Sequence, residues 1–311
     1  MRAGFVFEHA PFASAHASTI AETAEGGLVV AWFGGPCEGH SEVGIWCARE
    51  AGGVWSAPCE VARGLDRRGR RQPCWNPVLH QAEGGVLLLF YKVGPSPRRW
   101  TGALLRSFDA GGSWSAPEPL PPGILGPIKN KPHRLADGSL LCPSSTEDRG
   151  WRCHLELTPD LGASWQRSPT LQAPWRLGAI QPCVFDHGHR LQLLARSRNG
   201  RLATAWSQGS WHSWSPLEAT GLPNPDSGID ALMLADGRAL LVYNPVRRGR
   251  TPLGLALSPD GRSWQPSRLL EDGPGEFSYP AVIQGADGRI HVTYTWQRQR
   301  IRHVALTPDD L

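Results

Sequence analysis

The feature that most constrains this 311-residue chain is a turn motif that occurs six times at a nearly constant interval. Each copy places glycine or a similarly permissive residue between two short apolar runs, which is typical of a tight antiparallel hairpin. The copies lie at residues 25–30, 83–88, 137–141, 186–191, 236–241 and 287–292. The steps from Gly85 to Gly138, Gly188, Gly237 and Gly288 are 53, 50, 49 and 51 residues. A period of about 50 residues predicts a fold built from six copies of one four-stranded unit.

A second motif recurs with the same period and combines aspartate, glycine and tryptophan. Intact copies occupy residues 107–114 and 158–165, and a copy one residue shorter occupies 258–264. Weaker copies end at Trp55 and Trp214, and residues 307–309 look like the start of another. The aspartate can accept backbone N–H groups across a turn, the glycine can take a positive φ, and the tryptophan can bury its ring against a neighbouring sheet. We therefore expect these boxes to be structural and not catalytic.

The pattern S-x-D-x-G-x-x-W in residues 107–114 is an Asp-box, and with it the chain resembles the sialidase-like superfamily, whose units are also called BNR repeats. The resemblance covers essentially the whole chain and is to the predicted-neuraminidase branch. It implies an all-β fold, namely a six-bladed β-propeller of four-stranded antiparallel blades, as a single domain over residues 1–311. Because such a ring leaves few exposed sheet edges, we expect the two chain ends to share one blade.

Composition excludes several other classes of protein. The net charge of +4 is too mild to indicate a nucleic-acid partner. The chain has no run of 18 apolar residues, so we expect no membrane partner. The first residues lack the basic and apolar regions of a secretion signal, so we expect a cytoplasmic protein. The seven cysteines form no C-x-x-C pair, and neither H-E-x-x-H nor a phosphate-binding glycine loop occurs. We therefore predict no metal site and no cofactor.

Six polar or aromatic residues precede the hairpins at corresponding places, where the innermost strand of each blade would start. Four of the six are followed by proline. They are His16, Asn76, Lys131, Gln181, Asp230 and Tyr279. In a propeller these positions converge on the central axis, which makes them a candidate site. The alternative is structural, with these side chains only satisfying backbone groups and waters at the axis.

The resemblance assigns roles to some of these residues, and it also shows two positions at which this chain differs from the family. Sialidases hold a substrate carboxylate with three arginines, use a tyrosine activated by a glutamate as nucleophile, and use an acid/base in a first-blade loop. Tyr279 matches the nucleophile and Arg196 the second arginine, while Arg247 or Arg250 is expected to supply the third. His16 stands where the first arginine is expected, and Gln181 where the glutamate is expected. Glutamine cannot deprotonate a phenol of pKa about 10, so the usual hydrolysis of neuraminic acid glycosides is in doubt.

Other residues offer acids, bases and anion-binding groups near the same place. The loop 33–42 supplies Glu38 and Glu42 in the region of the family's acid/base. His16 is an alternative base, since imidazole accepts protons near neutral pH. Candidates for substrate binding precede or flank the predicted inner strands. Of these, Lys129 and Lys131 could bind an anion, and the further substrate-binding candidates are Asn130, Asn76, Asp230 and Lys92, with Glu147 and Glu276 as carboxylates nearby.

These residues leave three functions open. The first is an exo-acting glycosidase for an acidic, carboxylate-bearing sugar or related small molecule. The second is a lyase, isomerase or cyclase in which His16 is the base. The third is a non-catalytic propeller that binds a glycan or a protein, because a fold can be kept while its chemistry is lost.

Overall fold

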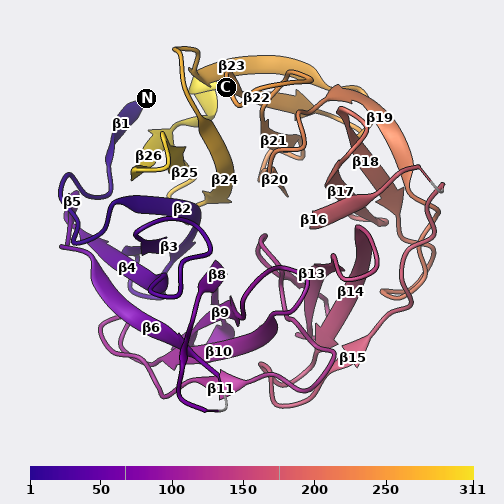
Figure 1. The fold of residues 1–311 in the computed structure, drawn as a ribbon. Coiled ribbons are helices and arrows are strands. Elements are labelled where there is room, and N and C mark those ends of the chain that lie inside the picture. Colours follow the sequence, from indigo (N-terminus) through magenta and orange to yellow (C-terminus); the bar gives the residue numbers. More distant parts are fainter. Residues whose placement is uncertain (67, 175) are drawn as a thin grey trace.

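The computed structural model describes residues 1–66, 68–174 and 176–311. The described chain is almost entirely β-structure, arranged as six antiparallel sheets around a central axis (Figure 1). The predicted six-bladed β-propeller is therefore confirmed. Within the described residues, neither of the two short helices, η1 (Glu83–Gly85) and η2 (Pro308–Asp310), has the length and apolar character needed to cross a lipid bilayer.

The blades follow one another along the chain, and the first strand of each lies closest to the axis. Blade 1 contains β2 (Ser14–Glu22), β3 (Leu28–Gly35), β4 (Gly44–Ala51), β5 (Val54–Trp55), β6 (Cys59–Leu65) and β7 (Arg71–Gln72). Blade 2 contains β8 (Cys74–Gln81), β9 (Leu87–Val93), β10 (Thr101–Ser107) and β11 (Glu118–Pro119). Blade 3 contains β12 (His133–Arg134), β13 (Leu140–Thr146), β14 (Arg152–Thr158) and β15 (Gln166–Arg167).

The second half of the ring repeats this order. Blade 4 contains β16 (Ala179–Asp186), β17 (Leu191–Ser197), β18 (Arg201–Trp206) and β19 (Glu218–Pro223). Blade 5 contains β20 (Asp230–Met233), β21 (Ala239–Tyr243), β22 (Leu253–Ser258) and β23 (Gln265–Glu271). Blade 6 contains β24 (Phe277–Gln284), β25 (Ile290–Trp296) and β26 (Arg300–Leu306), and its outer strand is β1 (Arg2–Phe5).

The two ends of the chain close the ring together. β1 pairs antiparallel with β26, with Arg2 opposite Ala305 and Phe5 opposite Arg302. The N-terminal ammonium lies 3.0 Å from a carboxylate oxygen of Asp310. The expectation that both ends share one blade is therefore confirmed, and the ends lie side by side in Figure 1.

The Asp-boxes stabilise turns at the blade edges. In the box of blade 2, Asp109 accepts hydrogen bonds from the backbone N–H and the hydroxyl of Ser113, at 2.8 and 2.7 Å. These bonds lower the pKa of Asp109 to about 2. Asp160 and Asp260 make the same contacts with Ser164 and Ser263. The carboxylates are engaged in turn geometry, as the sequence predicts.

The apolar core lies between adjacent blades. Leu79 and Leu89 of blade 2 pack in one cluster with Val29 and Ala31 of blade 1. Each such pair of sheets removes apolar side chains from water, at roughly 1.5–3 kcal/mol for a fully buried large aliphatic side chain. The blades are thereby held at fixed positions around the axis.

Candidate active site

The inner strands are irregular at the positions that the sequence singles out. The ladder between the first two strands is interrupted at these positions in blades 1, 2, 4 and 6. Asn76, Gln181 and Tyr279 each have a positive φ, of 40°, 53° and 52°, and each precedes proline. Ala17, next to His16, has φ 53°. A β-bulge changes the direction in which side chains point. Residues held at such positive φ values are concentrated at functional sites.

Tyr279 lies at the centre of a group of residues that we call the axial cluster: His16, Arg196, Arg250, Tyr279 and Arg298. The His16 and Tyr279 ring centroids are 4.3 Å apart, with the rings tilted by 53°. The guanidinium carbons of Arg196 and Arg250 each lie 5.5 Å from the centroid of the Tyr279 ring. Four residues predicted from the sequence are thus brought together from blades 1, 4, 5 and 6.

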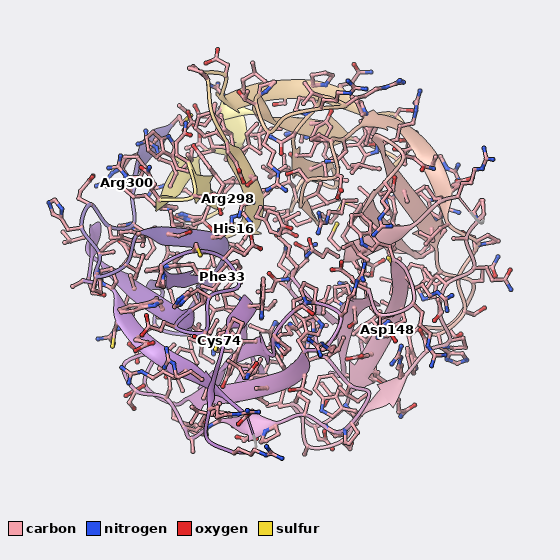
Figure 2. All side chains as sticks on the ribbon, viewed as in Figure 1. His16, Phe33, Cys74, Asp148, Arg298 and Arg300 are labelled. Carbon is pink, nitrogen blue, oxygen red and sulfur yellow. The ribbon has the colours of Figure 1, made fainter. Side chains whose placement is uncertain are left out.

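Arg298 is the member of the axial cluster that sequence reasoning missed. It lies in the turn between β25 and β26 with φ 55°, and its carbonyl accepts the backbone N–H of Ala15 at 2.9 Å. Its charge acts on the neighbouring His16 (Figure 2). Its position in the repeat could have identified it in the sequence. Arg196 lies on the second strand of its blade, and Arg250 and Arg298 lie between the second and third strands of theirs.

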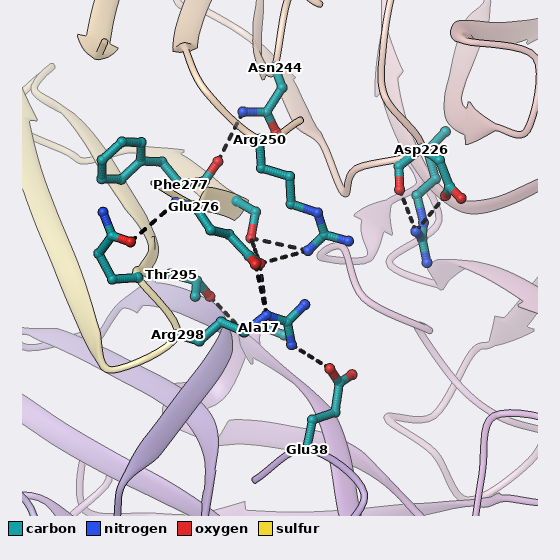
Figure 3. Close-up of polar contacts among 12 residues, drawn as sticks. Ala17, Glu38, Asp226, Asn244, Arg250, Glu276, Phe277, Thr295 and Arg298 are labelled. Atoms are coloured by element: carbon teal, nitrogen blue, oxygen red, sulfur yellow. Dashed lines mark hydrogen bonds and ion pairs between the residues drawn. The ribbon is translucent and has the colours of Figure 1, made fainter. Parts of the chain in front are cut away.

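Each arginine of the axial cluster already bonds a carboxylate. Glu276 lies between Arg250 and Arg298, and it accepts from Arg250 Nη1 at 2.8 Å and from Arg298 Nε at 2.9 Å (Figure 3). The other end of Arg298 donates to Glu38. Burial acts to raise the pKa of Glu276, but the hydrogen bond from Arg298 and the charges of both arginines bring it below its ordinary value.

Arg196 has its own acidic partner, Asp226. Its Nη1 donates to both the carbonyl and the carboxylate of Asp226, each at 2.8 Å. Asp226 was not predicted, and it has a positive φ of 65°. No signal in the sequence marks Asp226, because it belongs to neither of the two repeated motifs.

Several buried polar atoms of this region have no hydrogen-bond partner within the part of the chain that the structure describes. They are both ring nitrogens of His16, Oε1 of Gln181 and Nε of Arg196. Most buried polar groups in proteins are paired, so the unpaired atoms of His16 and Arg196, both beside Tyr279, are what a site for a polar ligand requires.

His16 is a neutral base in this environment. Burial lowers its pKa well below the ordinary value, and the charges of Arg298, Arg250, Arg196 and Lys129 lower it further. An imidazole that is neutral at neutral pH has a free nitrogen that can accept a proton. Gln181, in contrast, offers only an amide, although it lies on the same ring of bulges.

The segment 126–131, expected to bind an anion, crosses the axis and joins the blades. Asn130 donates to the carbonyls of Gln181 and Pro182, and Lys129 donates to the carbonyls of Ile229 and Pro280. Burial lowers the pKa of Lys129 to about 8. Both side chains therefore donate to backbone carbonyls of blades 4, 5 and 6.

Lys131, Asp230 and Asn76 also make contacts within the ring. Lys131 Nζ lies 2.8 Å from Asp230, which in turn accepts the backbone N–H of Val282 at 2.9 Å. Asn76 donates to the carbonyl of Ile128 at 3.2 Å. These three residues of the predicted ring therefore bond to backbone groups and to each other, which is the structural role that the sequence left open for them.

The remaining predicted residues lie elsewhere. Lys92 is fully buried between blades 2 and 3, where it donates to the Pro127 carbonyl. Arg247 is exposed beside Gly200, and Glu42 is exposed beside His40. Among the described residues, no hydrogen bond, ion pair or ring contact joins these three to the axial cluster. No group of three or more histidine, cysteine, aspartate or glutamate residues in the described part of the chain is arranged to hold a metal ion.

A six-bladed ring of Asp-box blades, with arginines gathered around an axial tyrosine, defines the sialidase-like class of β-propeller. The family described as a BNR repeat-like domain matches residues 26–292, and the chain belongs to that family. No curated protein matches the chain.

Solved structures share the fold at low sequence identity. A protein of unknown function from Dyadobacter fermentans DSM 18053 has a TM-score of 0.81 and 18% identity, over 97% of both chains. The NanB sialidase from Streptococcus pneumoniae has a TM-score of 0.79 and 13% identity, over 99% of this chain and 71% of its own. The intramolecular trans-sialidase from Ruminococcus gnavus has a TM-score of 0.76 and 13% identity, over 98% and 97%. At such identities the likeness concerns the fold.

Proposed function

We propose that this protein is a glycosidase that cleaves the bond between a carboxylate-bearing sugar and its leaving group. The observation that carries the proposal is the position of Arg196, Arg250 and Arg298 around Tyr279. Guanidinium groups bind carboxylates through paired N–H donors, and each guanidinium has five such donors. Solved sialidases with the same fold support the choice of an acidic sugar.

Tyr279 is the nucleophile in this proposal, and His16 replaces the expected glutamate as its base. The two rings are in contact, and His16 is neutral because it is buried among cations. Tyr279 Oη forms a bond to the anomeric carbon and gives its proton to His16, while the bond from that carbon to the leaving oxygen breaks. Nearby cations stabilise the negative charge that develops on the phenol oxygen. Water then attacks the anomeric carbon, its bond to Tyr279 Oη breaks, and His16 returns its proton to that oxygen. The proton that the water loses balances the proton that the leaving oxygen gains.

The test uses aryl glycosides of sialic acid and of glucuronic acid, with an aryl galactoside as the neutral control. We expect turnover of an acidic glycoside only. Tyr279→Phe abolishes it, and His16→Gln lowers kcat by roughly 10²–10⁴-fold, the usual contribution of a general base. Because the pKa of His16 is lowered, the wild-type rate is retained as pH falls through the normal histidine range and is lost only further down. Binding of acidic sugars without turnover, or full turnover by Tyr279→Phe, contradicts the proposal.

One observation favours a second reaction at the same site. The two ring nitrogens of His16 have no partner among the described residues, and this suits proton abstraction from a sugar carbon. The sequence also has an amide, Gln181, in place of the expected carboxylate. Elimination leaves an unsaturated sugar that absorbs in the near ultraviolet and incorporates no solvent oxygen. Product analysis in heavy-oxygen water separates this lyase reaction from hydrolysis.

A further inference from the structure

The loop 224–229 lies against Tyr279 and is anchored at both ends. The backbone N–H of Asn224 donates to the Gly200 carbonyl at 3.1 Å, and the Asn224 side chain accepts from Ser227 N at 3.0 Å. At the other end, the Ile229 carbonyl accepts from Lys129. A Cβ added at Gly228 would come within 3.1 Å of the Tyr279 ring. The loop is therefore a fixed wall of the site.

Asp226 is the exposed member of this fixed loop. Its side chain is 46% accessible, whereas that of its partner Arg196 is 9% accessible. The charged groups that act on Asp226 are Arg196, Arg250 and Arg198, together with Glu147, whose own pKa is influenced by Asp226. Burial raises the pKa of Asp226, and the three arginines oppose that rise. The balance between the two protonation states of Asp226 thus depends on its bond to Arg196.

We propose that Asp226 is the proton donor of this site, and that a substrate carboxylate releases it from Arg196. The inference rests on the proposed function. A carboxylate bound over Tyr279 takes up donors of the Arg196 guanidinium, whose Nη1 also holds Asp226, and so competes with Asp226 for this arginine. The displaced Asp226 then faces the bound carboxylate and Glu147, two negative charges, with less compensation from Arg196, and it takes up a proton from solvent. It gives that proton to the leaving oxygen as the anomeric bond breaks, and it recovers a proton from the attacking water.

Glu38, the acid expected from the sequence, is less suited to this role. Its carboxylate is bound by Arg298, which also bonds Glu276 and lies apart from Asp226 in Figure 3. Asp226 is instead paired with Arg196, so a substrate carboxylate at Arg196 changes the surroundings of Asp226 directly.

The first experiment measures proton uptake on binding. Sialic acid and glucuronic acid are titrated into the protein by calorimetry near neutral pH, in buffers of different ionisation enthalpy. We expect uptake approaching about one proton per bound sugar in the wild type, none in Asp226→Asn, and the wild-type value in Asp148→Asn. Asp148 is an exposed carboxylate of a neighbouring blade (Figure 2). Binding without proton uptake, or uptake that persists in Asp226→Asn, overturns the inference.

The second experiment varies the leaving group. Asp226→Asn should slow cleavage of alkyl glycosides by roughly 10²–10⁴-fold but have little effect on glycosides of acidic phenols, which leave without a proton. Glu38→Gln should not show this dependence. If Glu38→Gln shows it and Asp226→Asn does not, Asp226 is not the donor. If the wild type neither binds nor cleaves acidic sugars, the proposed function itself fails, and thermal unfolding of each variant shows whether it is folded.

Discussion

At the scale of single residues, the site depends on side chains held in uncommon backbone conformations. Tyr279, Gln181 and Asp226 all have positive φ, and Arg298 has φ 55°. Such conformations cost roughly 1–3 kcal/mol each and persist only where the surrounding structure fixes them. Here the surrounding structure is the packed ring, which holds the tyrosine and its cations at fixed distances.

Gly228 tests how closely Tyr279 must be held. Its backbone is not in the left-handed region, so alanine is acceptable to the chain, but the new Cβ would meet the ring at 3.1–3.4 Å. We expect Gly228→Ala to lower kcat/KM by roughly 10-fold, because small misplacements of a reacting group are costly. The free energy of unfolding should change by no more than about 1 kcal/mol.

The matched control is Gly221→Ala in β19, where an added Cβ has no atom within 4 Å. Steady-state kinetics and thermal unfolding of the two variants make the comparison. Equal activity of both would show that the Tyr279 ring tolerates displacement.

At the scale of elements, the segment 124–131 connects the blades and forms part of the site's framework. Its first residues are held by buried charged side chains between blades 2 and 3. Glu156 accepts the backbone N–H groups of Leu125 and Gly126 and contacts His154 at 2.8 Å. Burial lowers the pKa of Lys92 to about 7, while the charge of Glu156 opposes that effect. The glutamate thus supports both the segment and the buried lysine.

Glu156→Gln should therefore be strongly destabilising. The change removes the carboxylate that compensates Lys92, and breaking one partner of a buried charge group typically costs about 3–5 kcal/mol. The exposed pair of Arg106 and Glu118 is the control, and Glu118→Gln should cost at most about 1 kcal/mol. Urea unfolding of both variants measures the difference, and similar midpoints would contradict the assigned role of Glu156.

At the scale of the whole molecule, the four residues of β1 complete the last blade and help to close the ring. This strand pairs with β26, and Phe5 packs edge-on against Trp296 with ring centroids 5.3 Å apart. Without β1 the backbone of β26 would be an unpaired edge, which promotes association with other chains. Closure therefore affects both the stability and the solution state of the protein.

Deletion of residues 1–5 should lower the free energy of unfolding by roughly 2–4 kcal/mol, since each lost ladder hydrogen bond contributes about 0.5–1.5 kcal/mol. Chemical unfolding and light scattering measure the effect. A circular permutant that joins the adjacent ends and opens at the exposed hairpin near Gly237 keeps all blade pairings, and it should remain within about 1–2 kcal/mol of the wild type. If the permutant unfolds as readily as the deletion variant, loss of the pairing between β1 and β26 is not the cause of the lower stability.

The sequence by itself determined the repeat, the turns and therefore the propeller, because hairpins and Asp-boxes are specified by residues close together in the chain. It also indicated His16 and Tyr279, since they precede the hairpins at corresponding places. The resemblance to sialidases added Arg196 and the choice of Arg247 or Arg250. Only the tertiary structure decided which charges face one another. Arg298 enters from a turn, Asp226 from a loop without a repeat, and Lys131 turns to Asp230, because ion pairs form between residues far apart in the chain once closure of the ring brings them together.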